Sequence, residues 1–273
     1  IKLAIFFCKM KVVALVSGGK DSCFNMMRCA EEGHEVVCVA NLHPPNEIAE
    51  LDSYMYQSVG SEGIKFYADA LGLPLFQRKI SGRPKCVESN TYVQDEEDEV
   101  EDLYHLLKTV KEWDPEIRGV SAGAINSTYQ KLRVEHVCER LGLVPLCFLW
   151  ELDQLQLLDA MISAGVKAVL IKVAALGLTP KHLGHSLEQM RAHLVAMHAK
   201  YGLHVCGEGG EYETFVLDCP MFKRRRIAMD EATTEVHFNS APNDAICPVA
   251  YLKLGNLSLV EKEAEEKKNI CAR

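Results

Sequence analysis

The sequence lacks several features that define other classes of protein. None of its 11 cysteines forms a Cys-x-x-Cys pair, and no apolar run approaches the roughly 18–20 residues that span a bilayer. Scattered, odd-numbered cysteines without a clear secretory signal favour reduced thiols and a cytoplasmic protein. Basic residues are in deficit, with 30 Lys and Arg against 38 Asp and Glu. The net charge of −8 argues against stable binding of nucleic acid, and we expect no membrane partner.

The length of 273 residues, with 48% apolar and 25% charged residues, suits a globular chain of about two domains. We place a first domain at residues 10–147 and a second domain at residues 148–260. Residues 261–273 form a charged tail that we expect to be disordered. Residues 1–9 precede Met10 and read as a non-native or gene-model extension.

Hydrophobic patterning predicts an α/β fold. Residues 12–16 form an apolar, β-branched run typical of a strand that is buried on both faces of a parallel sheet. A glycine-containing loop, a helix and a second apolar strand at 36–42 follow, as in a doubly wound fold. Beyond residue 150 the chain becomes richer in strand patterns, which predicts a smaller α+β domain.

Two further helices are expected in the first domain. One spans about residues 54–71. The other opens at residues 95–102, where seven of eight residues are acidic and complement the helix dipole, and we expect these acids to form a solvated face.

The loop at residues 17–22, Ser-Gly-Gly-Lys-Asp-Ser, has the chemistry of an anion site. Its glycines allow backbone N–H groups to approach a phosphate, and the following helix favours negative charge at its N-terminus. Ser17 and Ser22 can donate to phosphate oxygens, Lys20 supplies a cation and Asp21 suits a magnesium ion. The spacing fits neither a Walker A loop nor a dinucleotide-binding Gly-x-Gly-x-x-Gly.

This loop resembles the PP-loop of the ATP pyrophosphatases. The resemblance implies a Rossmann-like, HUP-type sheet, with ATP and Mg²⁺ as cofactors. It also implies cleavage of ATP between the α and β phosphates and transfer of AMP to a substrate oxygen. The implied pyrophosphate-binding residues are Ser17, Gly18, Gly19, Lys20, Asp21 and Ser22, with Lys20 and Asp21 catalytic and Asp21 the magnesium ligand.

Residues 50–57, 121–135, 172–178 and 206–214 resemble the corresponding stretches of the diphthine–ammonia ligase family, and the similarity covers about residues 10–254. The resemblance implies that translation elongation factor 2 bearing diphthine is the protein substrate, and that its carboxylate becomes an acyl-adenylate that ammonium converts to an amide. Because the remaining length holds no glutaminase-like domain, free ammonium is the expected nitrogen source.

Small residues mark the nucleotide edge of the predicted sheet. Gly123, Ala124 and Ile125 end one strand at its carboxyl edge, and Asn41 and Leu42 end a neighbouring strand at the same edge. We expect adenine or ribose to lie there. A tight strand-to-helix turn is the alternative reason for Gly123.

A second group of residues suits a cationic substrate. Glu208, Glu211 and Glu213 lie among three glycines, and carboxylates and aromatic rings bind the fixed trimethylammonium of diphthine. Magnesium binding is the alternative role of these acids. The expected substrate-binding residues are Tyr54, Tyr56, Gln130, Arg133, Glu208, Glu211, Tyr212, Glu213 and Thr214.

Other assignments remain open from sequence. Arg133 suits either a phosphate contact or an ion pair with Glu135 or Asp21. The basic run at 223–226 suits an exposed strand edge or a docking patch for an acidic protein surface. The alternative functions are a tRNA-modifying PP-loop enzyme and a non-catalytic nucleotide-binding module.

Overall fold

The structure is a computed structural model that describes residues 9–45, 53, 55–85, 91–230, 233–239 and 247–262. The expectations for residues 1–8, for Tyr54 and for residues 263–273 of the tail therefore lie outside the described residues. The tail expected at 261–273 is wrong for its first two residues, because Glu261 ends a strand and Lys262 is buried. Within the described part of the chain, no helix is long and apolar enough to cross a membrane.

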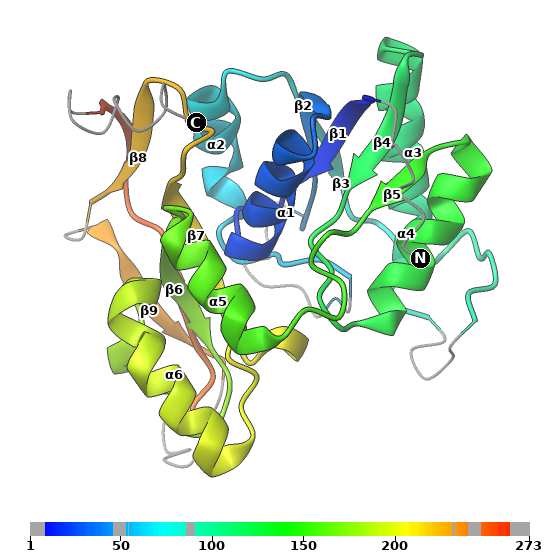
Figure 1. The fold of residues 1–273 in the computed structure, drawn as a ribbon. Helices are drawn as coiled ribbons and strands as arrows, with labels where there is room; N and C mark the ends of the chain where they lie inside the picture. Colours follow the sequence, from blue (N-terminus) through cyan, green and yellow to red (C-terminus); the bar gives the residue numbers. More distant parts are fainter. Residues whose placement is uncertain are drawn as a thin grey trace, which may run out of the picture.

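A five-stranded parallel sheet forms the first part of the chain (Figure 1). Its spatial order is β3-β2-β1-β4-β5, which places the first strand at the centre. The strands are β1 (Lys11–Leu15), β2 (Glu35–His43), β3 (Leu75–Lys79), β4 (Ile117–Ser121) and β5 (Val144–Leu146). The chain reverses its direction of winding between β1 and β4, where ligands bind in such sheets.

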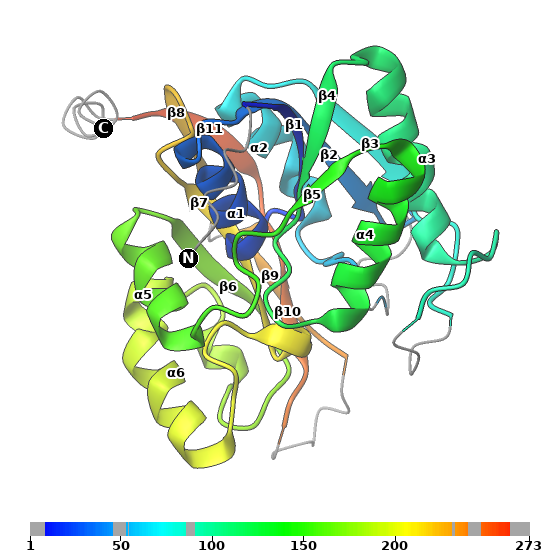
Figure 2. The same ribbon diagram turned by 45° about the vertical axis from the view of Figure 1, so that its right-hand side comes forward.

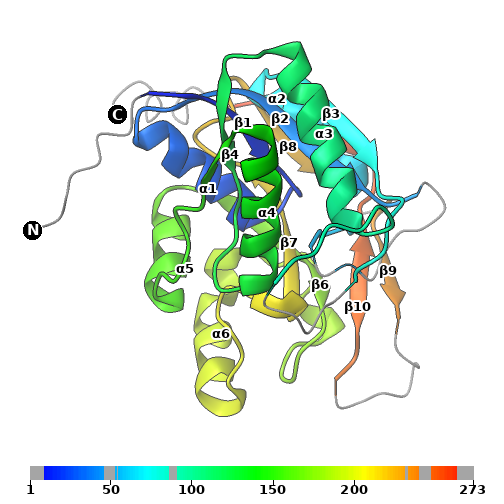
Figure 3. The same cartoon turned by 90° about the vertical axis from the view of Figure 1, so that its right-hand side faces the viewer.

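Helices cover both faces of this sheet, which confirms the doubly wound α/β fold (Figure 3). Successive residues of a strand point to opposite faces. Ala14 of β1 therefore lies in the core with α1 (Lys20–Glu31) and α2 (Ile64–Leu71). Its neighbour Val13 lies in the core with α3 (Glu99–Trp113) and α4 (Thr128–Leu141).

The acidic run opens α3 as expected, but the expected solvated face is wrong. Asp98 caps the helix by accepting from Val100 N, yet the carboxylates of this first turn are almost completely buried. Asp102 accepts from the backbone N–H groups of Ser81 and Gly82, at 2.7 and 2.9 Å. These carboxylates tie a loop to the helix instead of meeting water.

The helix expected at 54–71 is also shorter than predicted. It begins at Ile64, after a single 3₁₀ turn η1 (Ser61–Gly63), and no helix includes the described residues 55–60. Gly60 adopts φ +83°, and Ser53 Oγ accepts from the backbone N–H groups of Met55 and Tyr56. This side-chain turn competes with helix formation, and the segment before Ser61 stays irregular.

The second part of the chain is α+β, as expected (Figure 2). An antiparallel sheet with the order β7-β6-β10-β9 packs against α5 (Gln154–Ser163) and α6 (Leu187–Tyr201). Its strands are β6 (Lys167–Val173), β7 (Tyr212–Asp218), β9 (Glu235–Phe238) and β10 (Ala250–Lys253). A separate pair joins β8 (Arg225–Met229) to β11 (Leu257–Glu261). The basic residues 223–226 are exposed, and two of them precede β8 while two lie within it.

One hydrophobic core joins the two parts. Phe24 of α1 and Phe215 of β7 belong to the same buried cluster, and Gly18 leaves room for the Phe215 ring. Tyr67 of α2 packs edge-on against Phe222, with ring centroids 5.0 Å apart. The division at residues 147/148 stays a prediction, and the buried side chains extend across it.

Asn25 connects α1 to the strands beside it. Its fully buried amide donates to Ser121 Oγ and Leu146 O, at 2.8 and 2.7 Å, and accepts from Phe148 N at 2.8 Å. Removing the amide takes the side-chain acceptor from Phe148 N and a donor from Ser121 Oγ and Leu146 O, and an unsatisfied buried group is costly.

We therefore expect Asn25→Ala to lower the free energy of unfolding by about 3 kcal/mol, measured by urea denaturation. The buried neighbour Met26 provides a control, since Met26→Leu conserves volume and should cost less than about 1.5 kcal/mol. Equal losses in the two variants would contradict the structural role of the Asn25 amide.

Candidate active site

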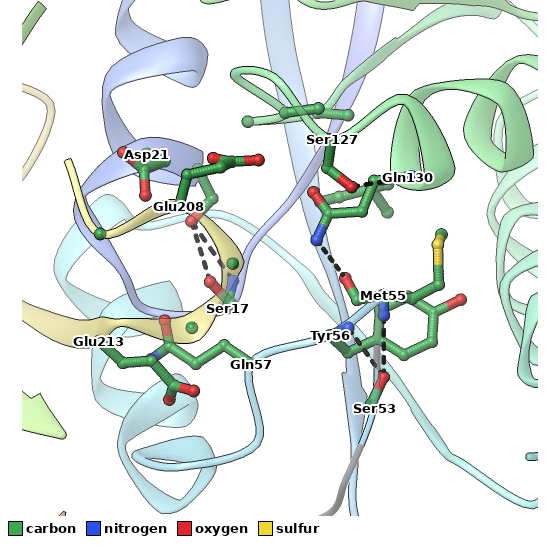
Figure 4. A pocket seen from close by; sticks show the side chains of 18 of the residues that line it. Ser17, Asp21, Ser53, Met55, Tyr56, Gln57, Ser127, Gln130, Glu208 and Glu213 are labelled. Atoms are coloured by element: carbon green, nitrogen blue, oxygen red, sulfur yellow. Dashed lines mark hydrogen bonds between the residues drawn. The ribbon is translucent and has the colours of Figure 1, made fainter. Parts of the chain in front are cut away.

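A cavity of about 1020 Å³ lies at the carboxyl ends of β1, β2 and β4. The start of β7 and the 3₁₀ turn η3 (Glu208–Gly210) form its opposite wall, so both parts of the chain line it (Figure 4). Polar groups from separate elements converge there, as in binding sites generally.

The phosphate loop occupies one end of this cavity. Gly18 has φ +86°, and a Cβ at this position would come within 2.8 Å of the Phe215 ring. The backbone of Gly18 also accepts a hydrogen bond from Val216 N at 2.8 Å. Glycine is thus required here both for backbone conformation and for the close approach of β7.

Lys20 is buried between the two parts of the chain. Its Nζ donates to Asp21 Oδ2 at 2.9 Å and to Cys206 O at 2.5 Å, and lies 4.9 Å from the Tyr212 ring centroid. Burial lowers the pKa of Lys20, but the negative charge of Asp21, the electrostatic effects of Tyr212 and Cys206 and the hydrogen bond to Asp21 together outweigh it and leave the pKa above its ordinary value. The lysine is therefore a charged link between α1 and the C-terminal part.

Two carboxyl groups face the same end of the cavity (Figure 4). Burial raises the pKa of Asp21 and outweighs the opposing charge of Lys20. Burial and then the negative charge of Asp21 raise the pKa of Glu208. The carboxylate Oδ1 of Asp21 is buried and has no hydrogen-bond partner among the described residues.

The remaining acids of this wall have partners. Glu211 Oε2 accepts from the backbone N–H of His204 at 2.7 Å, and burial raises the pKa of Glu211. Glu213 pairs with Lys172 across β6 and β7, at 3.2 Å. Thr214 Oγ1 accepts from Lys20 N at 3.0 Å, which satisfies the first N–H of α1.

The nucleotide edge is close to α1. A Cβ on Gly123 would come within 2.6 Å of Ser22 N and 2.7 Å of the Asp21 carbonyl carbon. Close backbone approach to the phosphate loop therefore explains Gly123 better than a tight turn alone. Asn41 is buried at the same edge, where its amide donates to Val16 O at 2.9 Å.

The structure brings most of the expected site residues together. Those that line the cavity are Ser17, Lys20, Asp21, Ser22, Asn41, Leu42, Tyr56, Gly123, Ala124, Gln130, Glu208, Glu211, Tyr212, Glu213 and Thr214. Gly18, Gly19, Ile125 and Arg133 are outside the lining, and Tyr54 is outside the described residues.

Arg133 is fully buried, and its guanidinium stacks on the Tyr129 ring at 3.3 Å from the centroid. It also donates to the backbone carbonyls of Tyr129 and Lys85. Neither a phosphate contact nor an ion pair with Glu135 or Asp21 describes this arrangement. The residue packs α4 against the loop at Lys85, because its flat cation fits between aromatic rings.

Several cavity residues were not predicted from sequence. Asn126 N donates to Glu208 Oε1 at 3.4 Å, and Gln57 Nε2 donates to Thr214 O at 3.1 Å. Asn126 directly follows the predicted strand edge, a position that could have identified it. Gln57, Ser127 and Lys172 lie in the family-like stretches, whereas Asn239 had no sequence signal.

A central parallel strand that leads through Ser-Gly-Gly-Lys-Asp-Ser into a helix, beneath a cavity at the switch point of the sheet, defines a PP-loop nucleotide-binding protein. Family models narrow this class. The diphthamide synthase N-terminal domain matches residues 10–145, and the diphthamide synthase C-terminal domain matches residues 153–244. The chain belongs to the diphthamide synthase family.

Curated relatives support this membership. The diphthine–ammonia ligase of Rattus norvegicus is 56% identical over 257 residues, which cover 93% of this chain and 94% of the rat protein. The diphthine–ammonia ligase of Homo sapiens is 54% identical with the same coverage. The Schizosaccharomyces pombe enzyme is 54% identical over 226 residues, and this match covers 37% of that longer protein.

The half-buried His204 makes stability dependent on pH. Burial, the charge of Lys20 and then that of His198 lower the pKa of His204 from 6.5 to about 4. Between these values the unfolded chain binds a proton that the folded chain does not, so stability falls as pH drops from 6.5 to 4. Above pH 6.5 the imidazole is neutral in both states and contributes no slope.

We expect His204→Asn to flatten this decline. The amide oxygen of asparagine can still accept from Cys206 N, as His204 Nδ1 does, but it does not titrate. Urea denaturation at a series of pH values measures the slope for both proteins. Parallel curves between pH 6.5 and 4 would refute the assignment.

The close approach of Gly123 gives a second prediction. Gly123→Ala places a methyl group against the backbone of the first turn of α1, which must then move. We expect the Kd for ATP, measured by calorimetry, to rise about tenfold or more, because small displacements at phosphate sites are costly.

Gly33→Ala is the matched control. Gly33 has φ +85° with no atom within 4 Å of an added Cβ, so this change should cost about 1 kcal/mol of stability. It should leave the Kd for ATP unchanged. An unaltered Kd in Gly123→Ala would show that α1 tolerates the methyl group.

Proposed function

We propose that the chain is an ATP-dependent ligase that joins ammonia to the carboxylate of diphthine and releases AMP and pyrophosphate. One observation carries the proposal. The phosphate loop and the carboxylate-rich wall formed by η3 and β7 line one cavity, in a chain of the diphthamide synthase family. That arrangement suits a nucleotide and a cationic substrate at the same time.

ATP binds with its phosphates at residues 17–22, where the dipole of α1 and the hydroxyls of Ser17 and Ser22 favour negative charge. The adenine and ribose lie at the carboxyl edge of the sheet, against Asn41, Leu42, Gly123 and Ala124. Small side chains and backbone at this edge leave space for a flat base.

The reaction runs in two displacements. A diphthine carboxylate oxygen attacks the α-phosphorus and expels pyrophosphate, which gives an acyl-adenylate. Ammonia then attacks the acyl carbon and expels AMP, and the proton lost from nitrogen goes to solvent. Lys20 supplies positive charge beside the leaving pyrophosphate, so the chain acts through positioning and charge neutralisation.

A magnesium ion suits the end of the cavity where Asp21 and Glu208 lie. Asp21 Oδ1 is buried without a partner among the described residues, and burial and then the negative charge of Asp21 raise the pKa of Glu208. No group of three or more metal-binding side chains occurs among the described residues, and Mg²⁺ typically takes one or two carboxylates plus phosphate oxygens. When bound, the ion neutralises phosphate charge, and Asp21 and Glu208 would hold it.

The trimethylammonium group of diphthine binds at the other wall. The Tyr212 ring already contacts the Lys20 ammonium, and the Tyr212 hydroxyl donates to Val205 O at 2.6 Å. Tyr56 lines the cavity and donates to Glu99 O at 3.2 Å, which fixes its ring. Tyr56 is therefore the aromatic partner that we assign to the cation, and Glu211 and Glu213 line the same cavity.

The protein that carries diphthine is translation elongation factor 2, and free ammonium supplies the nitrogen in the cytoplasm. The exposed residues 223–226 form a basic patch suited to an acidic protein surface. The net charge of −8 disfavours nucleic acid as a stable partner.

Chromatography of nucleotide products tests the proposal. With Mg-ATP, ammonium chloride and diphthine-bearing elongation factor 2, we expect AMP to form in equimolar amount with the amide. Omitting ammonium or the factor, or adding EDTA to remove magnesium, should each abolish turnover. Formation of ADP, or of AMP with tRNA in place of the factor, would sink the ligase proposal.

A further inference from the structure

A buried ion pair lies in the wall of the cavity, outside the phosphate loop. Lys172 of β6 and Glu213 of β7 are register partners in the antiparallel sheet. Lys172 Nζ lies 3.2 Å from Glu213 Oε1, and each side chain is 15% exposed. Both residues line the cavity, so a bound molecule can reach them.

The described cavity lining has more negative than positive side chains. Its described lining contains the four carboxylates of Asp21, Glu208, Glu211 and Glu213, but only two lysines, Lys20 and Lys172. Lys20 is 2% exposed on its side chain and bonded to Asp21 and Cys206 O. Among these lining residues, Lys172 is therefore the cation that a second anionic group can approach beside the nucleotide.

The proposed substrate brings one charge of each sign. Diphthine carries the carboxylate that reacts and a fixed trimethylammonium group, and neither ion is stable in a partly dry cavity without a partner. The reacting carboxylate must also approach the α-phosphate, which is itself negative. A cation beside that carboxylate lowers the repulsion between the two groups.

We propose that the Lys172–Glu213 pair opens when diphthine binds. The Lys172 ammonium takes the diphthine carboxylate and orients it, while Glu213 takes part of the trimethylammonium charge. The contact between Lys172 and Glu213 is thereby exchanged for a contact of each side chain with the substrate. This assignment rests on the proposed ligase function and makes Lys172 a substrate-binding and specificity residue.

The fold places this pair beside the nucleotide. Thr214 follows Glu213, and its hydroxyl oxygen accepts from Lys20 N, while Thr214 O accepts from Gln57 Nε2. The start of β7 is thus attached to the phosphate loop on one side and to β6 on the other. A carboxylate held by Lys172 lies in the same cavity as the phosphates.

Charge exchange between the two positions gives the sharpest test. In the double variant K172E/E213K the strands retain an ion pair, but each charge faces the wrong end of the substrate. We expect its KM for diphthine-bearing factor to rise about 100-fold or more, and that of K172M to rise about 10- to 100-fold. The KM for ATP should stay within about threefold, and K172R should recover part of the loss.

A matched control lies on the same strand. Lys167 of β6 pairs with Glu188 at 2.5 Å, each about half exposed, and both are outside the cavity lining. The exchange K167E/E188K should leave both KM values unchanged. Thermal melting of every variant separates loss of fold from loss of binding.

Each outcome decides the assignment. Wild-type KM and kcat in K172E/E213K would show that the pair is purely structural, and a loss confined to ATP would place Lys172 on the nucleotide. If the exchanged variant does not fold, K172M provides the test. The assignment then requires that its KM for diphthine-bearing factor rises while its KM for ATP does not. Absence of AMP formation by the wild type would instead sink the proposed function, before any variant is compared.

Discussion

The attachment of β7 to the phosphate loop is the constraint on which the site depends. Val216 N bonds to Gly18 O, Thr214 Oγ1 accepts from Lys20 N, and Lys20 Nζ reaches Cys206 O. Through these bonds an antiparallel sheet from late in the sequence fixes a loop from its beginning. The nucleotide edge, the carboxylates of η3 and the β6–β7 pair share one cavity as a result. The junction of the phosphate loop with β7 is what gives the cavity its second wall.

Much of this architecture is predictable from local sequence, because it depends on local physics. The apolar run before Ser17 can only be a strand buried on both faces, and two glycines before Lys20 allow a loop that closes on phosphate. The placement of Gly123 and Asn41 at one edge follows from the rule that the carboxyl ends of parallel strands meet at the same edge of the sheet. The wrong or missing expectations concern residues whose state depends on particular side-chain partners, which hydrophobic periodicity does not reveal.

Three of these residues illustrate the limit. Ser53 keeps residues 55–60 out of a helix through side-chain bonds that helix periodicity does not register. Arg133 is in a helix that leaves the active edge, yet its cation turns toward the Tyr129 ring. Lys172 gains its importance from Glu213, 41 residues later in the chain, and only the register of β6 and β7 brings the two together. Spacing along a sequence carries no information about such pairings.

The core that continues from Phe24 to Phe215 has a mechanical consequence. Enzymes built from two loosely joined lobes open and close like a jaw, and their turnover often follows that motion. Here a jaw-like opening would expose side chains that both sheets bury. The free-energy cost would be about 25 cal/mol for each Å² of apolar surface exposed. The shared core therefore favours one rigid body over two hinged lobes.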